Sequence, residues 1–344
     1  MTIASPTANT VEIPAASLRV QPWKLLGDHN QIGAPTWNAA REAAGLTWEP
    51  TEQRIPRCDE NGHPIVTGLD DEGRPVYEVE ADYKRLTRGR GGKTLGIVGD
   101  GYGVITHEAL GRLIDPVLDV PGTTFEHLVE LNEGRKIFGL VKIGDDTVLP
   151  GDFSPTTPYL AFTTSHDGGG ALRVWGTATR WICTNQMAAS EATGRKKGMH
   201  ATIRHTSLWQ LRTEKVHELV AQTRNQFGMI SSLFDELSHI RIDGKVREAF
   251  VRNYFPMPIG AEATDRAIKA TESKRETLRA LFEMETNAPL MGSALGLAQS
   301  AIEWADHLRR AESADSMLHR NVIRPQDMKL RAWKMARNAV SLAA

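Results

Sequence analysis

The sequence lacks the features that disulfide-stabilised, secreted and membrane-spanning proteins need. It contains only two cysteines, Cys58 and Cys183, which lie far apart and do not make a disulfide framework. No uninterrupted apolar run approaches the roughly 20 residues of a membrane span. The N-terminal segment has neither the basic start nor the long apolar core of a secretory signal. We therefore expect a protein of the reducing cytoplasm with no membrane partner.

Neither sign of charge is in large excess, since 41 Lys and Arg face 42 Asp and Glu. The charges are unevenly spread, however. Residues 1–84 hold 7 basic against 13 acidic residues (−6), residues 85–200 hold 13 against 12 (+1), and residues 201–344 hold 21 against 17 (+4). This gradient suits head-to-tail self-association into a homo-oligomer, or an anionic partner at the basic end. Such offsets are also common where they have no role.

The residue pattern divides the chain into three regions, of which residues 1–84 are the first. This region combines a flexible arm with a short helix near 37–44, which Gly45 ends. Two turn signals, Asp-Glu-Asn-Gly and Asp-Asp-Glu-Gly, predict a surface hairpin near 54–80.

Residues 85–204 are expected to form an α+β core, a mostly antiparallel sheet with flanking helices. One helix is expected to begin at Thr106 and a second to cover 125–132. Strands are expected at 95–98, 102–105, 136–143, 159–164 and 172–183.

Residues 205–344 are expected to form a helical region. Apolar residues recur at helical spacing from Val216 to Leu237. Further helices are expected at 265–285, 293–310 and 325–340. The predicted fold class is therefore α+β, with a C-terminal helical region added to the sheet.

The most distinctive motif is a Ser-His-Asp-Gly-Gly-Gly turn at residues 165–170. Its plainest interpretation is a hairpin turn, because Asp-Gly is common turn chemistry. A ligand or nucleic-acid contact is a second interpretation. Catalysis is a third, with His166 as a general base beside Asp167 and with help from Asn185. No H-E-x-x-H or C-x-x-C pattern occurs, so neither a metal nor a cofactor is expected.

A basic, glycine-rich segment precedes the strand expected at 95–98. It is not a nucleotide-binding P-loop, because Thr87 stands where that motif needs glycine and the segment does not open a helix. Its cations either hold phosphates by charge or belong to a solvated linker. These cations are Arg85, Arg88, Arg90 and Lys93.

The strand expected at 172–183 carries arginine beside tryptophan. If it is extended, Arg173, Trp175 and Trp181 share one face, and Arg180 adjoins them. Such a face suits a stacking platform for single-stranded nucleic acid, because aromatic rings accept any base. The alternative is that the tryptophans belong to the core.

Two further basic clusters are present. They are either solvated surfaces or additional nucleic-acid contacts. The first is Arg195, Lys196 and Lys197, and the second, on the last expected helix, is Lys329, Arg331, Lys334 and Arg337.

Several short motifs follow one another in a set order. They are Ala44-Gly45-Leu46-Thr47-Trp48, Leu95-Gly96-Ile97-Val98 before Tyr102, His166-Asp167-Gly168, Arg180-x-x-Cys183-x-Asn185, Ala301–His307, and Lys329 with Ala332. This order resembles that of a phage and plasmid protein family, the domain of unknown function 932. Trp304 stands where that family usually has tyrosine. The resemblance implies a phage or prophage setting in a bacterial host cell, and it implies no established chemistry.

We therefore predict a non-catalytic nucleic-acid-binding protein of phage or prophage DNA metabolism. Its expected partner is single-stranded DNA, which it would bind or anneal. A hydrolase or nuclease that uses the His-Asp-Gly turn is one alternative, and a protein-interaction factor without nucleic-acid binding is another. The expected contacts are Arg85, Arg88, Arg90, Lys93, Arg173, Trp175, Arg180, Trp181, Arg195, Lys196 and Lys197.

Overall fold

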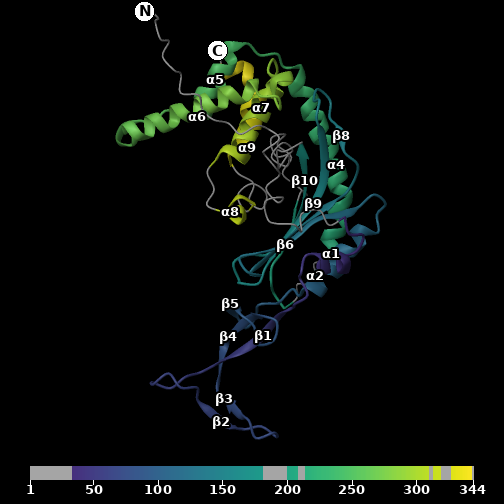
Figure 1. Ribbon diagram of the computed structural model, residues 1–344, viewed down its shortest axis with the longest axis vertical. Coiled ribbons are helices and arrows are strands. Elements are labelled where there is room, and N and C mark those ends of the chain that lie inside the picture. Colours follow the sequence, from purple (N-terminus) through teal and green to yellow (C-terminus); the bar gives the residue numbers. More distant parts are fainter. Residues whose placement is uncertain (1–32, 181–199, 208–213, 310–312, 319–326, 343–344) are drawn as a thin grey trace, which may run out of the picture.

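The computed structural model describes residues 33–180, 200–207, 214–309, 313–318 and 327–342. The molecule is elongated and has the predicted α+β class (Figure 1). A narrow group of strands lies at one end of the long axis, a larger antiparallel sheet lies in the middle, and helices gather at the other end.

The narrow end, which we call the stalk, comprises residues 50–99. A three-stranded antiparallel sheet has the order β1-β4-β5, and beyond it β2 and β3 form a separate two-stranded hairpin. The strands are β1 (Pro50–Pro56), β2 (Val66–Leu69), β3 (Pro75–Tyr77), β4 (Val79–Arg88) and β5 (Thr94–Gly99).

Both turn signals of the stalk form turns. The Asp59 carboxylate accepts hydrogen bonds from the backbone N–H groups of Asn61 and His63, and Asp70 does the same for Glu72 and Arg74. Each turn also has a glycine in the left-handed region, where other residues are strained.

The central sheet has the order β11-β10-β9-β7-β6, with β8 paired to β9, and every pairing is antiparallel. Two helices, α1 (Trp37–Ala43) and α2 (His107–Leu118), precede it in the chain. Its strands are β6 (Thr124–Leu131), β7 (Lys136–Lys142), β8 (Thr147–Val148), β9 (Pro155–Ser165), β10 (Leu172–Arg180) and β11 (His200–Ile203).

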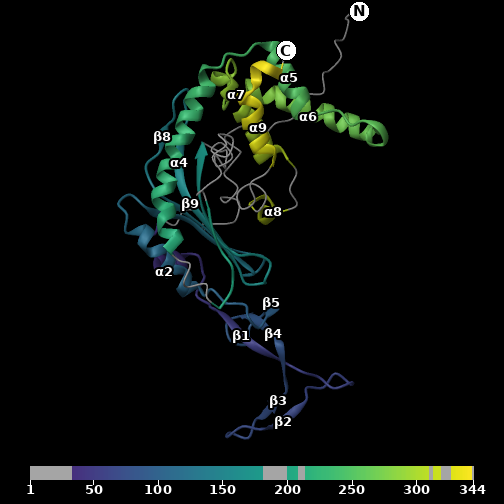
Figure 2. The same ribbon diagram turned by 180° about the vertical axis from the view of Figure 1, so that it is seen from behind.

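The C-terminal region is helical, as predicted. Its long helix α4 packs against β10 and runs beside the sheet (Figure 2). No helix in the described part of the chain has both the length and the apolar character needed to cross a membrane. The helices are α4 (Glu214–His239), α5 (Gly244–Tyr254), α6 (Asp265–Glu283), α7 (Ala294–Glu303), a π-helix (Trp304–Leu308), α8 (Ala314–Leu318) and α9 (Asp327–Arg337), with 3₁₀ turns at Gly260–Glu262, Ala288–Leu290 and Ala339–Leu342.

Separate cores hold these layers together. Helices α1 and α2 bury Trp37 and Leu110 against one side of the central sheet, where Phe125 and Phe162 lie. Another core forms among α4, α5, α6, α7 and α9. The stalk has only a small core at its base, around Leu86.

The expected helix at 125–132 is wrong, because this segment is strand β6. Its residues include good helix formers, but Phe125 and Leu128 are buried through pairing with β7, and this tertiary contact outweighs local preference. The strand expected at 102–105 is reduced to a single bridge from Tyr102 to Thr206.

Candidate functional site

The His-Asp-Gly turn closes tightly at the end of β9. The carboxylate of Asp167 accepts hydrogen bonds from the Ser165 hydroxyl and from the Gly169 backbone N–H, the latter at 2.8 Å. Gly168 has φ +77°, which a side chain would strain. The turn therefore uses Asp167 as a structural acceptor, which favours the hairpin interpretation.

Strand β5 packs directly on this turn. A Cβ atom at Gly96 would lie only 2.6 Å from the Cα of Asp167, so the close approach requires glycine. The hydroxyl of Tyr102, just after β5, donates a hydrogen bond of 2.6 Å to the carbonyl of Ser165. The Leu-Gly-x-Val motif and the following tyrosine thus hold the base of the stalk against the end of β9.

The ring of His166, a residue of this turn, lies against the ring of His107 on α2, and we call these two residues the histidine pair. Their ring centroids are 5.3 Å apart, both side chains are fully buried, and the Trp48 indole packs edge-on against both rings. The Glu49 carboxylate accepts the backbone N–H groups of His107 (2.7 Å) and Glu108 (3.2 Å) at the start of α2. This contact fixes where His107 enters the cluster.

Both histidines are neutral at physiological pH. Burial, with a smaller contribution from the charge of Arg41, lowers the pKa of His107 to about 4. Burial and then the neighbouring His107 lower the pKa of His166 well below its ordinary value. Neither ring nitrogen of His166 has a hydrogen-bond partner among the described residues. A fully buried ring cannot meet a substrate in this conformation, so the geometry gives the catalytic interpretation of His166 and Asp167 no support.

A third histidine, His205, completes the cluster. Its ring stacks on Tyr102 with a centroid separation of 4.5 Å. Its Nδ1 lies 3.0 Å from the carbonyl oxygen of Gly103, and its Nε2 lies 3.3 Å from the hydroxyl of Thr164. A carbonyl only accepts, so Nδ1 carries the proton and Nε2 accepts from the hydroxyl. Within the described residues, no group of three or more His, Cys, Asp or Glu side chains is arranged to hold a metal ion.

Arg88, one of the expected phosphate contacts, is part of this scaffold. Its guanidinium binds the carboxylate of Glu130 at 2.5 and 2.7 Å and lies 4.7 Å from the Trp48 ring centroid. Lys93 is exposed and forms an ion pair with Glu133 in the adjoining β6–β7 turn. The basic segment is therefore only partly available to an external anion.

Arg85 differs from Arg88 and Lys93, because it lies on the outer face of the stalk sheet and forms no ion pair in the described part of the chain. Arg85 is exposed on β4, directly opposite Ile97 on β5, and Tyr83 lies two residues away on the same face. The exposed fractions of Tyr83 and Ile97 are 54% and 62%. We call Tyr83, Arg85 and Ile97 the stalk face. Arg90 is exposed in the β4–β5 turn beside it.

Sequence reasoning missed the stalk face, although a signal was present. Tyr83 and Arg85 alternate with Lys84 and Leu86, and the latter two are buried. Strict alternation in a strand places Tyr83 and Arg85 together on the outside.

The stacking platform predicted on β10 is wrong for Trp175 and Arg180. Trp175 is only 2% exposed and packs in a core with Phe138 and Tyr159. Arg173 is half-buried and lies 5.6 Å from the Trp175 ring centroid. The core alternative therefore holds for this tryptophan.

Arg180 is fully buried and belongs to a polar network. Its guanidinium binds the carboxylate of Asp152 at 2.5 and 2.9 Å and donates to the carbonyl of Thr286 at 3.1 Å. The Thr286 hydroxyl in turn donates to Glu303 at 2.7 Å, and the Asn287 amide also donates to Glu303, at 2.5 Å. This ionic cluster joins the end of β10 to helix α7.

Lys329 on α9 is also buried and forms an ion pair with Asp306, so it is no surface cation. Arg331 donates to the Asn253 carbonyl at 2.6 Å, and Arg337 pairs with Glu236 at 2.9 Å. The basic face expected on the last helix is thus largely used within the protein. The remaining predicted residues, which lie outside the described ranges, are Trp181, Asn185, Arg195, Lys196 and Lys197.

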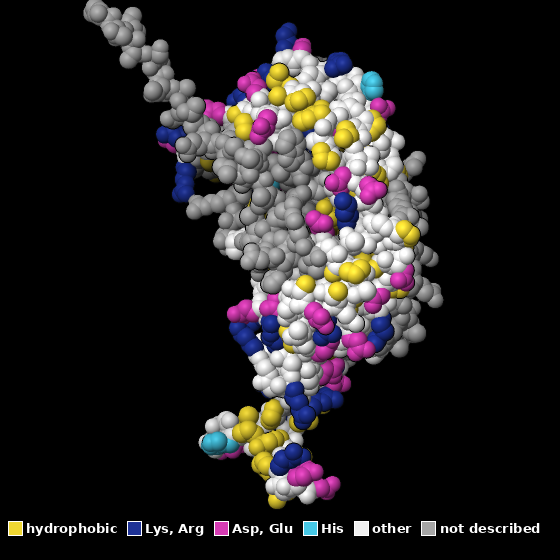
Figure 3. All heavy atoms as spheres, turned by 45° about the vertical axis from the view of Figure 1, so that its right-hand side comes forward, with side chains coloured by type: hydrophobic (Ala, Val, Ile, Leu, Met, Phe, Trp, Pro, Cys, Tyr) yellow, Lys and Arg dark blue, Asp and Glu magenta, His cyan; other side chains and the backbone are white. Residues whose placement is uncertain are grey.

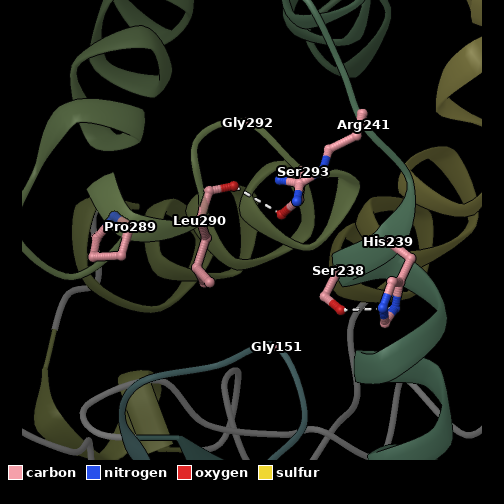
Figure 4. Close-up of a pocket in the computed structure, with 8 residues that line it drawn as sticks. All are labelled: Gly151, Ser238, His239, Arg241, Pro289, Leu290, Gly292 and Ser293. Atoms are coloured by element: carbon pink, nitrogen blue, oxygen red, sulfur yellow. Dashed lines mark hydrogen bonds between the residues drawn. The ribbon is translucent and has the colours of Figure 1, made fainter.

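A pocket of about 310 Å³ lies between the end of α4 and the start of α7 (Figure 4). Ser293 caps α7, and its hydroxyl donates to the Leu290 carbonyl at 2.8 Å. The Ser238 hydroxyl donates to the Asp235 carbonyl at 2.8 Å. Both serine hydroxyls therefore already have partners, and Arg241 and His239 provide the remaining polar groups. The lining residues are Gly151, Ser238, His239, Arg241, Pro289, Leu290, Gly292 and Ser293.

Together the sheet, the histidine cluster and the buried ionic cluster define an antiparallel α+β protein with a helical C-terminal region. Residues 94–336 match the family described as "Domain of unknown function (DUF932)", and the chain belongs to this family. The match confirms the expected resemblance and leaves out most of the stalk. No curated protein and no solved structure matches the chain.

Proposed function

We propose that this protein binds single-stranded nucleic acid without catalysis, through the stalk face and the β4–β5 turn. The observation that carries the proposal is the exposure of Tyr83, Arg85 and Ile97 side by side on a sheet. An aromatic ring can stack on any base, and an adjacent arginine can bind the phosphate backbone. This arrangement is what the predicted platform on β10 required, and it occurs instead on a strand where the side chains reach solvent.

The charge of the neighbouring chain supports the same assignment. Residues 84–93 contain five Lys and Arg and no Asp or Glu. Lys84, Arg88 and Lys93 form ion pairs with Glu52, Glu130 and Glu133, which leaves Arg85 and Arg90 as the exposed cations of this segment that have no ion-pair partner in the described part of the chain. Two or three phosphate contacts are enough for a measurable salt dependence of binding.

The biological setting is proposed from the motif resemblance. A family of phage and plasmid proteins, a bacterial cytoplasm and a platform for unpaired bases suit a protein of phage or prophage DNA metabolism. Single-strand binding or strand annealing in recombination is the activity we propose, with DNA as the partner.

Fluorescence anisotropy of a labelled single-stranded oligonucleotide, at two salt concentrations and with a duplex control, tests this proposal. Binding should be tighter for the single strand and should weaken with salt. Arg85→Glu and Arg90→Glu should each weaken binding, and each lost phosphate contact should reduce the logarithmic salt slope by about 0.7. Tyr83→Ala should cost about 1–3 kcal/mol of binding free energy if a base stacks there.

Arg112→Glu is the matched control, because Arg112 is also exposed but lies on α2, outside the stalk. It should leave binding unchanged. Absence of binding at low salt would overturn the proposal. An equal loss for Arg112→Glu and Arg85→Glu would show that only net charge matters and would remove the stalk face from the interface.

A further inference from the structure

The far end of the stalk exposes apolar side chains that belong to no core. We call residues 57–82 the stalk tip. Every residue of β2 and β3 is exposed, and Leu69 is 70% exposed. A two-stranded hairpin is marginally stable alone, and apolar side chains that gather in solvent indicate an association site. Figure 3 shows hydrophobic side chains gathered over the stalk, below a group of Lys and Arg side chains at its neck. The apolar residues of the tip are Val66, Leu69, Val76, Tyr77 and Val79.

The charge of the stalk tip restricts its partner. The tip contains eight Asp and Glu against two arginines, a net charge of −6. Both arginines are already paired, Arg57 with Glu78 and Glu80, and Arg74 with Asp70 and Glu72. A surface of this charge repels nucleic acid and also repels a second stalk tip. Its partner must be basic with an apolar centre.

The opposite end of the same chain has these properties. Residues 244–279, which cover α5 and most of α6, contain eight Lys and Arg against five Asp and Glu, a net charge of +3. Ile259, between the two helices, is 82% exposed. Exposed cations on α5 and α6 that have no ion-pair partner in the described part of the chain are Lys245, Arg252, Arg266, Lys269 and Lys274.

We infer that the stalk tip of one copy docks on the α5–α6 end of a second copy. The two surfaces lie at opposite ends of the long axis, and α6 projects away from the other helices (Figures 1 and 2). One molecule therefore cannot bring its own surfaces together. A contact between two different surfaces is heterologous, so repetition of it builds a ring or a filament instead of stopping at a dimer.

Light scattering or sedimentation of the full chain, over a range of concentrations and at low and high salt, tests the inference. The mass should rise beyond that of a dimer with concentration and should fall with salt, because opposite charges contribute to the contact. Leu69→Ser and Ile259→Ser should each stop growth beyond the monomer. Val148→Ser is the matched control, since Val148 is 56% exposed on β8 and lies on neither surface.

Mixing the two variants separates this arrangement from others. Leu69→Ser keeps an intact α5–α6 end and Ile259→Ser keeps an intact tip, so the mixture should form a one-to-one dimer and nothing larger. Asp71→Lys and Lys269→Glu should each weaken assembly, because each places like charges across the contact. A mixture of the two variants should restore an attractive contact. It should therefore assemble better than a mixture of Asp71→Lys chains with unmodified ones. A protein that stays monomeric at every concentration would overturn the inference. So would assembly that Leu69→Ser abolishes and Ile259→Ser leaves intact, since this means tip-to-tip pairing.

Discussion

The guanidinium of Arg88 lies 4.7 Å from the ring centroid of Trp48, and both side chains bind the carboxylate of Glu130. Two residues further along the chain, Arg90 is exposed in the turn. The basic segment therefore divides between two roles, since Arg88 holds the stalk against β6 and Arg90 faces solvent.

This division predicts that Arg88→Ala changes stability and not binding, and that Arg90→Ala changes binding and not stability. Arg88→Ala should lower the free energy of unfolding by about 1 kcal/mol, because a partly exposed ion pair and a cation–π contact are lost. It should leave the salt slope of oligonucleotide binding unchanged. Arg90→Ala should reduce that slope and leave stability unchanged. Urea unfolding and anisotropy titrations on both variants measure the four quantities, and a reduced slope for Arg88→Ala would contradict the assignment.

The close packing of β5 on the His-Asp-Gly turn predicts that Gly96→Ala is destabilising. The added Cβ would lie 2.6 Å from Asp167 Cα and 3.0 Å from its carbonyl, so the turn must move. A cost of about 1–3 kcal/mol is expected for this overpacking. Gly68→Ala is the control, because a Cβ atom added there would have no other atom within 4 Å. Equal unfolding midpoints for the two variants would show that the turn moves without an energetic cost, and would contradict the prediction.

Stability should fall in mild acid because of the buried histidines. The pKa of His107 is about 4 in the folded chain against an ordinary value of 6.5, so the unfolded chain binds the extra proton first. The stabilisation is complete above pH 6.5 and is lost as the pH falls towards 4. Between pH 7.5 and pH 5, His107 alone should cost about 2 kcal/mol of unfolding free energy. His166 and His205 act in the same direction, since burial lowers the pKa of each.

Urea unfolding at the two pH values checks this expectation. His107→Gln should flatten the pH dependence, because it removes the buried imidazole whose pKa is lowered. A pH dependence that survives His107→Gln in full would mean that other groups are responsible.

The buried pair of Lys329 and Asp306 predicts a strong asymmetry between single and double substitutions. Lys329→Met leaves a carboxylate without its cation in a fully buried site, and a loss of about 3–5 kcal/mol is expected. Asp306→Leu with Lys329→Met removes both charges and should recover most of that loss. Denaturant midpoints for the wild-type, single and double variants decide the matter, and additive losses would contradict a direct pairing.

Local patterns predicted the parts of the fold that local forces determine. Helix α4 follows from apolar spacing, α1 from its N-cap at Thr36 and the Gly45 stop, and the stalk turns from their Asp and Gly residues. The prediction of a helix at 125–132 was wrong because strand β6 is stabilised by its pairing with β7, and the residues of β6 alone do not indicate that pairing. Helix α5 was missed despite a usable signal, since the Asp243 side chain caps it by accepting from the Val246 backbone N–H.

The candidate site was harder to predict than the fold. Charge identified the basic segment, but which of its cations are free depends on Glu130 and Glu133, some 40 residues away in sequence. The burial of Trp175 and Arg180 depends on what packs against β10, which strand alternation alone does not reveal. The short motifs come together in two places, the histidine cluster at the end of β9 and the buried ionic cluster at the end of β10. Their residues share no common chemistry, so only the packing of the sheet and helices explains why they lie together.

One β-hairpin connects these two places. Strand β9 ends at the turn that carries His166, and its partner β10 ends at Arg180, which lies opposite Thr156 at the start of β9. The histidine pair and the buried ionic cluster are thus anchored to opposite ends of the same pair of strands. Both clusters therefore depend on the same pairing of β9 with β10, and we expect the sheet and the helical region to melt in one cooperative transition.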